Sequence, residues 1–362
     1  MSSHRHGVVM AGGSGTRLWP MSRMALPKQL LPMRDGQSLL KLAYERLEGV
    51  VPAERRYICA SRAHEAPIRA ELPRLPALGF LGEPMGRDTL NAVGLAATVV
   101  AKADPDGVMA VLTADHLIEP VGILRERMAE AFALVEQDRC RLVTFGITPT
   151  YPATGFGYVE SGDAVPGAPH ARLARRFAEK PTRETAQSFL AAGNFLWNSG
   201  MFVLSARTVL EAICSYQPEC AAGLARIGAA WGTPDAGRTI DAVYPALPRI
   251  SVDRALMEPA SADPRYSICV VPLPVQWLDI GSWPAFASTL EPDASGNRTN
   301  ARAVHLDSRG VTCVSDDPSH VIATIGCEDL VIVRTRDATL VCPAALAERV
   351  KEIAGMVPTE AR

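Results

Sequence analysis

The stretch GVVMAGGSGTRLWP, residues 7–20, joins a short hydrophobic run to a loop with three glycines in four positions. A loop of this kind after a buried strand lets backbone N–H groups converge on phosphate oxygens, and Arg17 can add a bidentate cation. The loop matches neither GxGxxG nor GxxxxGK[ST], so the two commonest nucleotide fingerprints do not apply. On the glycines alone, a phosphate-binding loop and an ordinary glycine turn both remain open. Lys28, in PKQ, supplies a second cation nearby, as a polyphosphate would require.

Outward from this stretch, short β-branched runs alternate with longer stretches at helical spacing. This order is typical of strands joined by crossover helices, and it predicts an α/β fold with an open, Rossmann-like, mostly parallel sheet. Ligands are then expected beyond the carboxyl ends of the strands. The predicted strands are residues 7–11, 56–60, 108–112 and 141–146, and the predicted helices are residues 38–47 and 124–136.

The pattern changes near residue 290. Residues 291–300, EPDASGNRTN, are polar and turn-rich, which is typical of a linker. We therefore expect one domain over residues 1–288 and a small C-terminal β-domain over residues 289–362. Evenly spaced strands suit either a meander or a β-solenoid, and residues 344–356 have the pattern of a closing amphipathic helix. The predicted C-terminal strands are residues 303–306, 311–314, 321–325, 330–334 and 339–341.

Composition narrows the classes of partner. The chain has 362 residues with 37 Lys+Arg against 39 Asp+Glu, a net charge of −2, so no positive field favours nucleic acid. The longest uncharged apolar stretch, residues 90–101, is shorter than the roughly 20 residues that a membrane span needs. The eight cysteines have no zinc-site spacing, and no secretory segment precedes the first strand. We expect a cytoplasmic protein with reduced thiols.

Residues 11–30, AGGSGTRLWPMSR…PKQL, resemble the signature of the sugar-1-phosphate nucleotidylyltransferase family, and the LWPMSR continuation resembles its mannose-1-phosphate guanylyltransferase branch. The resemblance extends over nearly the whole chain, and it includes a short β-helix domain after the catalytic domain. Its further motifs, in chain order, are EPMGRDT (83–89), LTADH (112–116), TFGITPTYPATGFGYVESG (144–162), FAEKP (177–181), LWNSGMF (196–202), SVDRALME (251–258) and WLDIGSW (277–283).

The resemblance implies transfer of GMP from GTP to mannose 1-phosphate, giving GDP-mannose and pyrophosphate with Mg²⁺. It also implies frequent dimers, so a homodimer is possible, and no isomerase activity is expected. Two polyanions must approach each other in such a reaction, so charge neutralisation dominates. The attacking sugar phosphate is already ionised near pH 7, so we expect no catalytic base. Arg17, Lys28, Asp115, Lys180 and Asp279 are the candidate catalytic residues.

Asp115 and Asp279 each follow an apolar run, at the predicted end of a strand. Mg²⁺ is commonly held by one or two carboxylates together with phosphate oxygens. The resemblance places the metal on these two aspartates, and it places the nucleotide near Asp115 as well. An ordinary turn or helix-capping role is the alternative for Asp115.

The resemblance assigns Lys180 to the phosphate of mannose 1-phosphate, and Glu179 and Asn198 to the sugar hydroxyls. Gly157 lies in a glycine-rich and aromatic run that would let the backbone approach the sugar. Trp197 and Trp283 are expected to be core or pocket wall, and His116 to be structural.

The nucleotide is expected to contact the first loop and the EPMGRDT motif. Asp88 stands where the family commonly has Asn. Its carboxylate could accept from the guanine edge, or it could cap a helix that starts at Thr89, and capping is the favoured alternative. The candidate nucleotide-binding residues are Ala11, Gly12, Gly13, Gly15, Thr16, Gly86, Arg87, Asp88 and Asp115.

Two other functions remain open at this stage. The same chemistry could act on another sugar 1-phosphate or nucleotide, because a few pocket contacts can redirect specificity. A nucleotide-sugar sensor without turnover is the second, although retention of the charged candidates argues against it. An NAD-dependent oxidoreductase is disfavoured, because the fingerprint with its acidic residue is missing.

Overall fold

The computed structural model describes residues 4–13, 15–34 and 36–358, which form two compact units. The first unit contains the chain up to Gly12 together with Leu42–Ala114 and Ile118–Trp277. The second contains Gly13–Lys41, Asp115–Leu117 and Leu278–Arg362. The domain boundary predicted between residues 288 and 289 lies within the second unit, and it stays a prediction.

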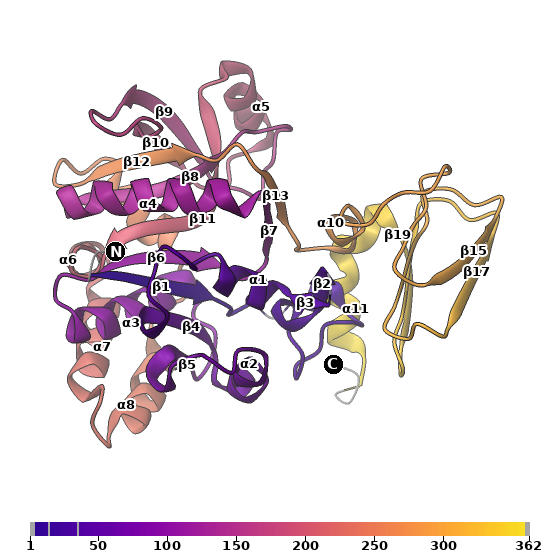
Figure 1. Cartoon of the computed structure of the whole chain (residues 1–362), viewed down its shortest axis with the longest axis horizontal. Helices are drawn as coiled ribbons and strands as arrows, with labels where there is room; N and C mark the ends of the chain where they lie inside the picture. The colour runs from indigo at the N-terminus through magenta and orange to yellow at the C-terminus, as the bar shows by residue number, and fades with distance from the viewer. Residues whose placement is uncertain (1–3, 14, 35, 359–362) are drawn as a thin grey trace. The chain divides into compact units, whose positions relative to one another are not determined.

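A nine-stranded sheet forms the centre of the first unit within the described residues (Figure 1). β5, β4, β1 and β6 run parallel, and β8 runs parallel to β12. β11 lies between β6 and β8 and is antiparallel to both. The mostly parallel α/β fold is thereby confirmed. In sheet order the strands are β5 (Phe80–Glu83), β4 (Arg56–Ser61), β1 (Arg5–Met10), β6 (Val108–Thr113), β11 (Phe195–Ser205), β8 (Arg141–Ile147), β12 (Ser267–Pro272), β10 (Arg172–Ala178) and β9 (Tyr158–Ala164).

The central strands are buried on both faces, which is why they appear in the sequence as continuous apolar runs. Val8 and Val9 point to opposite faces of β1, and neither is exposed. α3, α6 and α7 pack on one another and share a core with the sheet, whereas α4 packs on β6, β8 and β11 (Figure 1). The α-helices before residue 298 are α1 (Leu39–Glu45), α2 (Glu65–Glu71), α3 (Asp88–Ala103), α4 (Val121–Gln137), α5 (Arg183–Ala192), α6 (Ala206–Tyr216), α7 (Pro218–Ala230), α8 (Ala236–Val243), α9 (Glu258–Ala260) and α10 (Trp283–Ala287).

The predicted N-terminal strands are confirmed to within a few residues, and so is the helix predicted over residues 124–136. The helix predicted over residues 38–47 is shorter, since α1 spans Leu39–Glu45 and turns follow it. Across the described residues, no helix is long and apolar enough to span a membrane.

Six strands between residues 298 and 343, in the second unit, form a C-terminal β-domain with β-helix-like stacking. Thr312 of β16 pairs with Val331 of β18, and Arg302 of β15 pairs with Val321 of β17, both in parallel. Parallel stacking of successive coils is the pattern of a solenoid, so the β-helix-like alternative is confirmed and the meander is not. Its strands are β14 (Arg298–Thr299), β15 (Arg302–Leu306), β16 (Thr312–Ser315), β17 (Val321–Ile325), β18 (Leu330–Arg334) and β19 (Thr339–Pro343).

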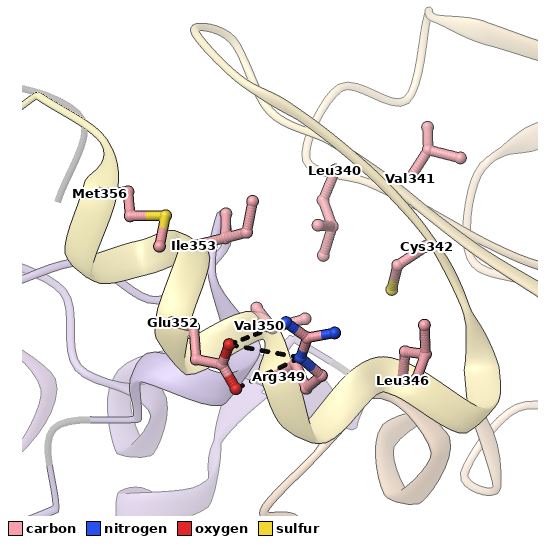
Figure 2. Close-up of a pocket in the computed structure, with 9 residues that line it drawn as sticks. All are labelled: Leu340, Val341, Cys342, Leu346, Arg349, Val350, Glu352, Ile353 and Met356. Atoms are coloured by element: carbon pink, nitrogen blue, oxygen red, sulfur yellow. Dashed lines mark hydrogen bonds and ion pairs between the residues drawn. The ribbon is translucent and has the colours of Figure 1, made fainter.

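Two expectations for this region need correction. The stretch predicted as a linker is ordered: the Asp293 carboxylate accepts from the backbone N–H groups of Ser295 and Asn297, and residues 298–299 form β14. The closing helix is divided into a 3₁₀ helix, η8 (Ala344–Arg349), and α11 (Val350–Met356). We call these two elements the terminal segment. A groove of about 290 Å³ lies between this segment and β19 (Figure 2).

Candidate functional site

The glycine loop leaves the carboxyl end of β1, beside the end of β6. The Ala11 N–H donates to the Cys59 carbonyl at 2.8 Å, so this amide is not available to a phosphate. Gly12 and Gly13 are exposed, as is Thr16. Gly12 lies against the Glu83 carboxylate, because a Cβ placed there would be 3.2 Å from Glu83 Oε2.

Gly15 is required by geometry on two counts. Its φ of +66° is left-handed, and a Cβ would lie 2.6 Å from the Cβ of Lys28. The absent side chain therefore lets the loop close over the stem of Lys28. The Ser22 hydroxyl fixes the same turn by donating to the Gly15 carbonyl at 2.6 Å.

Lys28 is buried and forms an ion pair with Asp115. Its Nζ lies 2.7 Å from Asp115 Oδ2 and 3.4 Å from the Ile280 carbonyl. Burial opposes ionisation of Asp115, but the charges of Lys28 and His116 outweigh burial and lower the pKa of the carboxyl. Asp115 is therefore held as a carboxylate near neutral pH.

Asp279 is brought beside Asp115 by the backbone. The Ile280 N–H donates to the Asp115 carbonyl at 3.1 Å, where β7 (His116–Glu119) pairs with β13 (Gln276–Asp279). No cluster of three or more His, Cys, Asp or Glu side chains able to hold a metal is found in the described residues. Two neighbouring carboxylates fit a divalent ion that takes its other ligands from phosphate and water.

Arg17 lies in the 3₁₀ helix η1 (Thr16–Leu18) and reaches the same place. A Cβ on Gly281 would lie 3.1 Å from Arg17 Nη2 and 3.3 Å from Asp279 Oδ1, so both side chains converge on this glycine. Arg17 Nη1 also donates to Glu348 Oε2 at 3.0 Å. The second unit thus gathers Arg17, Lys28, Asp115 and Asp279.

The first unit gathers the predicted sugar-binding residues. The Asn198 N–H donates to the Gly157 carbonyl at 2.8 Å, and a Cβ on Gly157 would lie 2.7 Å from Glu179 Oε2. Glycine at this position therefore keeps room beside the Glu179 carboxylate. Lys180 Nζ is 3.3 Å from Glu179 Oε1, and its side chain is 55% exposed, so the ammonium is accessible to an anion.

Lys180 has a strained backbone. Its φ of +48° is uncommon for a residue with a side chain. Such strain occurs where the surrounding structure holds a residue in place, frequently at functional sites.

Asp253 belongs to this group, and the sequence analysis did not assign it a role. Asn198 Nδ2 donates to Asp253 Oδ1 at 2.7 Å, while Asn198 Oδ1 accepts from the Thr144 hydroxyl at 2.8 Å. Burial and the nearby Glu179 charge raise the pKa of Asp253 to about 7. A signal was present, because Asp253 lies in the quoted SVDRALME motif. It begins a π-helical turn, Asp253–Met257, a feature frequent at functional sites.

The EPMGRDT motif holds the segment that leads to Asp253. The Arg87 guanidinium donates to the Pro245 carbonyl, and the Leu90 N–H donates to the Ile250 carbonyl. In the other direction, the Val252 N–H donates to the Thr89 hydroxyl. Buried Asn91 donates to the carbonyls of Arg87 and Pro248.

Asp88 and Gly86 are both exposed at the start of α3. Asp88 has a φ of +64°, and its carboxylate accepts from the Thr89 N–H at 2.8 Å. The capping role favoured from the sequence is not found, because α3 begins at Asp88 itself, Arg87 stands at the N-cap position, and no side chain there caps the helix. The guanine-reading role stays a prediction.

Glu83, at the head of the motif, is a second carboxylate without an assigned role. It is buried, and Tyr244 donates to its Oε1 at 2.6 Å. Burial raises the pKa of Glu83, and the Tyr244 hydrogen bond opposes the rise. The other Glu83 oxygen faces Gly12.

Trp197, Trp283 and His116 are buried, as expected of core residues. Trp197 makes edge contacts with Tyr151 and Phe156, and Trp283 Nε1 donates to the Trp19 carbonyl at 3.0 Å. His116 Nε2 lies 3.7 Å from Asp115 Oδ1, where it assists ionisation.

Comparison with known proteins gives two family matches. Residues 6–295 match the nucleotidyl transferase family, and residues 301–356 match the MannoseP isomerase/GMP-like beta-helix domain. A mannose-1-phosphate guanylyltransferase of Escherichia coli is 37% identical over 351 residues, covering 95% of this chain and 72% of that protein. The xanthan biosynthesis protein XanB of Xanthomonas campestris pv. campestris is 36% identical over 98% of this chain and 73% of that protein.

One solved structure is similar throughout. A crystal structure from Thermus thermophilus, described as a mannose-1-phosphate geranyltransferase, has a TM-score of 0.84 and 32% sequence identity. The match covers 98% of this chain and 99% of that chain.

The Asp253 carboxyl is expected to make stability depend on pH. Its pKa of about 7 in the folded chain exceeds the value near 4 of an unfolded aspartate. The unfolded state therefore loses this proton at lower pH, so the free energy of unfolding falls as pH rises from about 4 through 7, and then levels off. Asp253→Asn keeps an acceptor for Asn198 and removes this slope. The test is urea unfolding between pH 5 and 8.5. Relative to their difference at pH 5, the free energy of unfolding of the variant should rise against that of the wild type by on the order of 1–3 kcal/mol at pH 8.5.

Asp163→Asn is the matched control, because Asp163 is exposed on β9. Its profile should follow the wild type. Parallel profiles for the wild type and Asp253→Asn would contradict the assigned protonation.

Proposed function

This chain belongs to the nucleotidyl transferase family, and we propose that it transfers GMP from GTP to α-D-mannose 1-phosphate, forming GDP-mannose and pyrophosphate. The observation that carries the proposal is the grouping of Arg17, Lys28, Asp115 and Asp279 around one turn of the second unit. Two cations and two carboxylates beside a glycine loop suit a nucleoside triphosphate with its divalent metal. The guanylyltransferase relatives and the β-helix domain supply the substrate class.

The family generally uses a divalent metal, and we assign Mg²⁺ to Asp115 and Asp279. Their carboxylates are the oxygen ligands that Mg²⁺ prefers, and Asp115 is held ionised by Lys28. When bound, the ion would neutralise phosphate charge and align the triphosphate.

Arg17 and Lys28 neutralise the phosphate charge that the metal ion does not. Arg17 offers a planar guanidinium from the loop, and Lys28 a fixed ammonium from beneath it. Together with the exposed loop residues Gly13 and Thr16, they stabilise negative charge as pyrophosphate departs. No side chain needs to act as a general base, since the phosphate of the sugar is already ionised.

The first-unit group serves the sugar phosphate in this proposal. Lys180 binds the phosphate, while Glu179, Asn198 and Asp253 bond to sugar hydroxyls. The Asn198 amide is oriented by the Thr144 hydroxyl and Asp253, so its direction is fixed before the sugar arrives.

Pyrophosphate release tests the substrates directly. With Mg²⁺ and each of the four nucleoside triphosphates against several sugar 1-phosphates, turnover should be highest for GTP with mannose 1-phosphate. Another preferred pair would reassign the substrate. Absence of turnover with every pair would favour a nucleotide-sugar sensor and contradict the proposal.

Asp115→Asn and Asp279→Asn should each reduce kcat by two orders of magnitude or more, because each removes a metal ligand. Asp115→Asn also leaves Lys28 unpaired, so Asp279→Asn is the cleaner of the two. Asp241→Asn, at an exposed ion pair with Arg62, is the control and should keep full activity. Near-normal turnover in both test variants, with wild-type melting temperatures, would refute the metal assignment.

Lys180→Ala should raise KM for the sugar 1-phosphate and leave KM for GTP near the wild-type value. A charge-assisted hydrogen bond contributes about 1.5–3 kcal/mol, which corresponds to a rise of roughly 10- to 100-fold. Arg175→Ala, on the exposed face of β10, is the matched control. An unchanged KM for the sugar phosphate in steady-state kinetics would rule out the assigned role of Lys180.

A further inference from the structure

The second half of the loop signature, LWPMSR (residues 18–23), packs into the core of the C-terminal β-domain and terminal segment. Leu18 and Trp19 are buried there, and neither contributes a group to the candidate phosphate site. α11 packs directly on η1, the turn that carries Arg17. The core residues that meet Leu18 and Trp19 include Val331, Val333, Leu340, Ala347, Val350 and Ala354.

Arg23 binds the same stretch to the C-terminal β-domain by hydrogen bonds. Its Nη2 donates to Asp337 Oδ1 at 2.6 Å and to the Thr335 hydroxyl at 3.1 Å, both in the turn between β18 and β19. The guanidinium also lies over the Trp19 ring, with its carbon 5.7 Å from the ring centroid. The C-terminal β-domain therefore anchors the residues that follow η1.

Arg17 is the point at which this scaffold reaches the site. One terminal nitrogen of its guanidinium, Nη1, donates to Glu348 Oε2 of η8 at 3.0 Å. Its other terminal nitrogen, Nη2, lies next to Gly281, because a Cβ placed there would be 3.1 Å from it. The side chain is thus bound at one nitrogen by a carboxylate from the terminal segment, while its other terminal nitrogen lies beside Gly281, the glycine that also adjoins the Asp279 carboxylate.

We propose that Glu348 is a positioning residue for Arg17, through which the terminal segment takes part in nucleotide binding. The inference rests on the proposed function, in which Arg17 contacts the triphosphate. Arg17 has five N–H donors, and Glu348 occupies one nitrogen only, so donors remain for phosphate oxygens.

The energetics favour orientation over fold stability. Both side chains are well exposed, 41% for Arg17 and 63% for Glu348, and such pairs add little to stability. A free arginine, however, loses rotamer entropy when it binds a phosphate. A carboxylate that restricts Arg17 beforehand reduces that cost at the moment of binding.

The opposite effect is also conceivable for a negative charge beside a polyphosphate. If repulsion dominated, removal of the Glu348 charge would tighten nucleotide binding instead of weakening it. The sign of the change therefore decides between a positioning residue and an electrostatic competitor.

The terminal segment offers a matched control. Glu352 forms its ion pair with Arg349 of the same segment, beside the groove against β19 (Figure 2). Glu352→Gln removes the same charge from the same segment without touching Arg17. Asp337→Asn is a second control, because it loosens the anchoring of Arg23 and leaves Glu348 in place.

The experiment measures the Kd for GTP by calorimetry and steady-state KM and kcat for both substrates, in the full-length wild type and in Glu348→Gln. We expect Glu348→Gln to raise the Kd and KM for GTP about 3- to 10-fold, with KM for the sugar phosphate and the melting temperature unchanged. Glu352→Gln should match the wild type. In an Arg17→Ala background, Glu348→Gln should have no further effect on the Kd for GTP.

Each contrary result overturns the inference. Tighter GTP binding in Glu348→Gln would establish competition, and an unchanged Kd would show that Arg17 needs no partner. An equal loss in Glu352→Gln or Asp337→Asn, or a loss that persists without Arg17, would indicate a general structural effect. Normal wild-type turnover with any of these results would leave the proposed function standing. A wild type that neither binds nor uses GTP would overturn both.

Discussion

The ion pair of buried Lys28 with partly buried Asp115 is the interaction on which the candidate site depends. It joins two segments far apart in the sequence, and Lys28 also bonds to the backbone beside Asp279. A buried ion pair adds little stability compared with apolar packing, yet loss of one partner costs about 3–5 kcal/mol. A charged pair is therefore a poor choice for stability alone. Its benefit is chemical, because it keeps an ionised carboxylate and a fixed ammonium at the end of a strand.

The sheet and the loop could be predicted because their causes are local. Strands such as β1 and β6 are buried on both faces, so they appear as short apolar runs without alternation. Gly15 follows such a run, and its φ and its contact with Lys28 both demand glycine. The even spacing of the C-terminal strands allowed a meander as well as a solenoid, and only the family resemblance implied a β-helix. The proximity of Asp115 to Asp279 came from the family resemblance, since no local pattern links residues so far apart.

Asp253 and Glu83 both lie in quoted motifs, but no local pattern in the sequence indicates what either carboxyl contacts. Their surroundings are made by distant residues: Asn198 and Glu179 around Asp253, and Tyr244 around Glu83. The π-helical turn at Asp253 has no periodicity that distinguishes it from an ordinary helix. Segment 13–41 also gave no sign that it would share a unit with the C-terminal β-domain, because that grouping depends on contacts over some 300 residues.

The signature motif therefore combines two physical requirements. Its first part, AGGSGTR, ends in Arg17, whose guanidinium lies beside Gly281 in the second unit. Its second part is LWPMSR. In this part, Leu18 and Trp19 pack into a core that they share with the C-terminal β-domain, and Arg23 bonds to Asp337 in the turn between β18 and β19. A chain without that domain would lose the Asp337 and Thr335 contacts of Arg23 and part of the core around Trp19. The second half of the motif is thus explained by packing, and Arg17, at the junction, is where packing and phosphate chemistry meet.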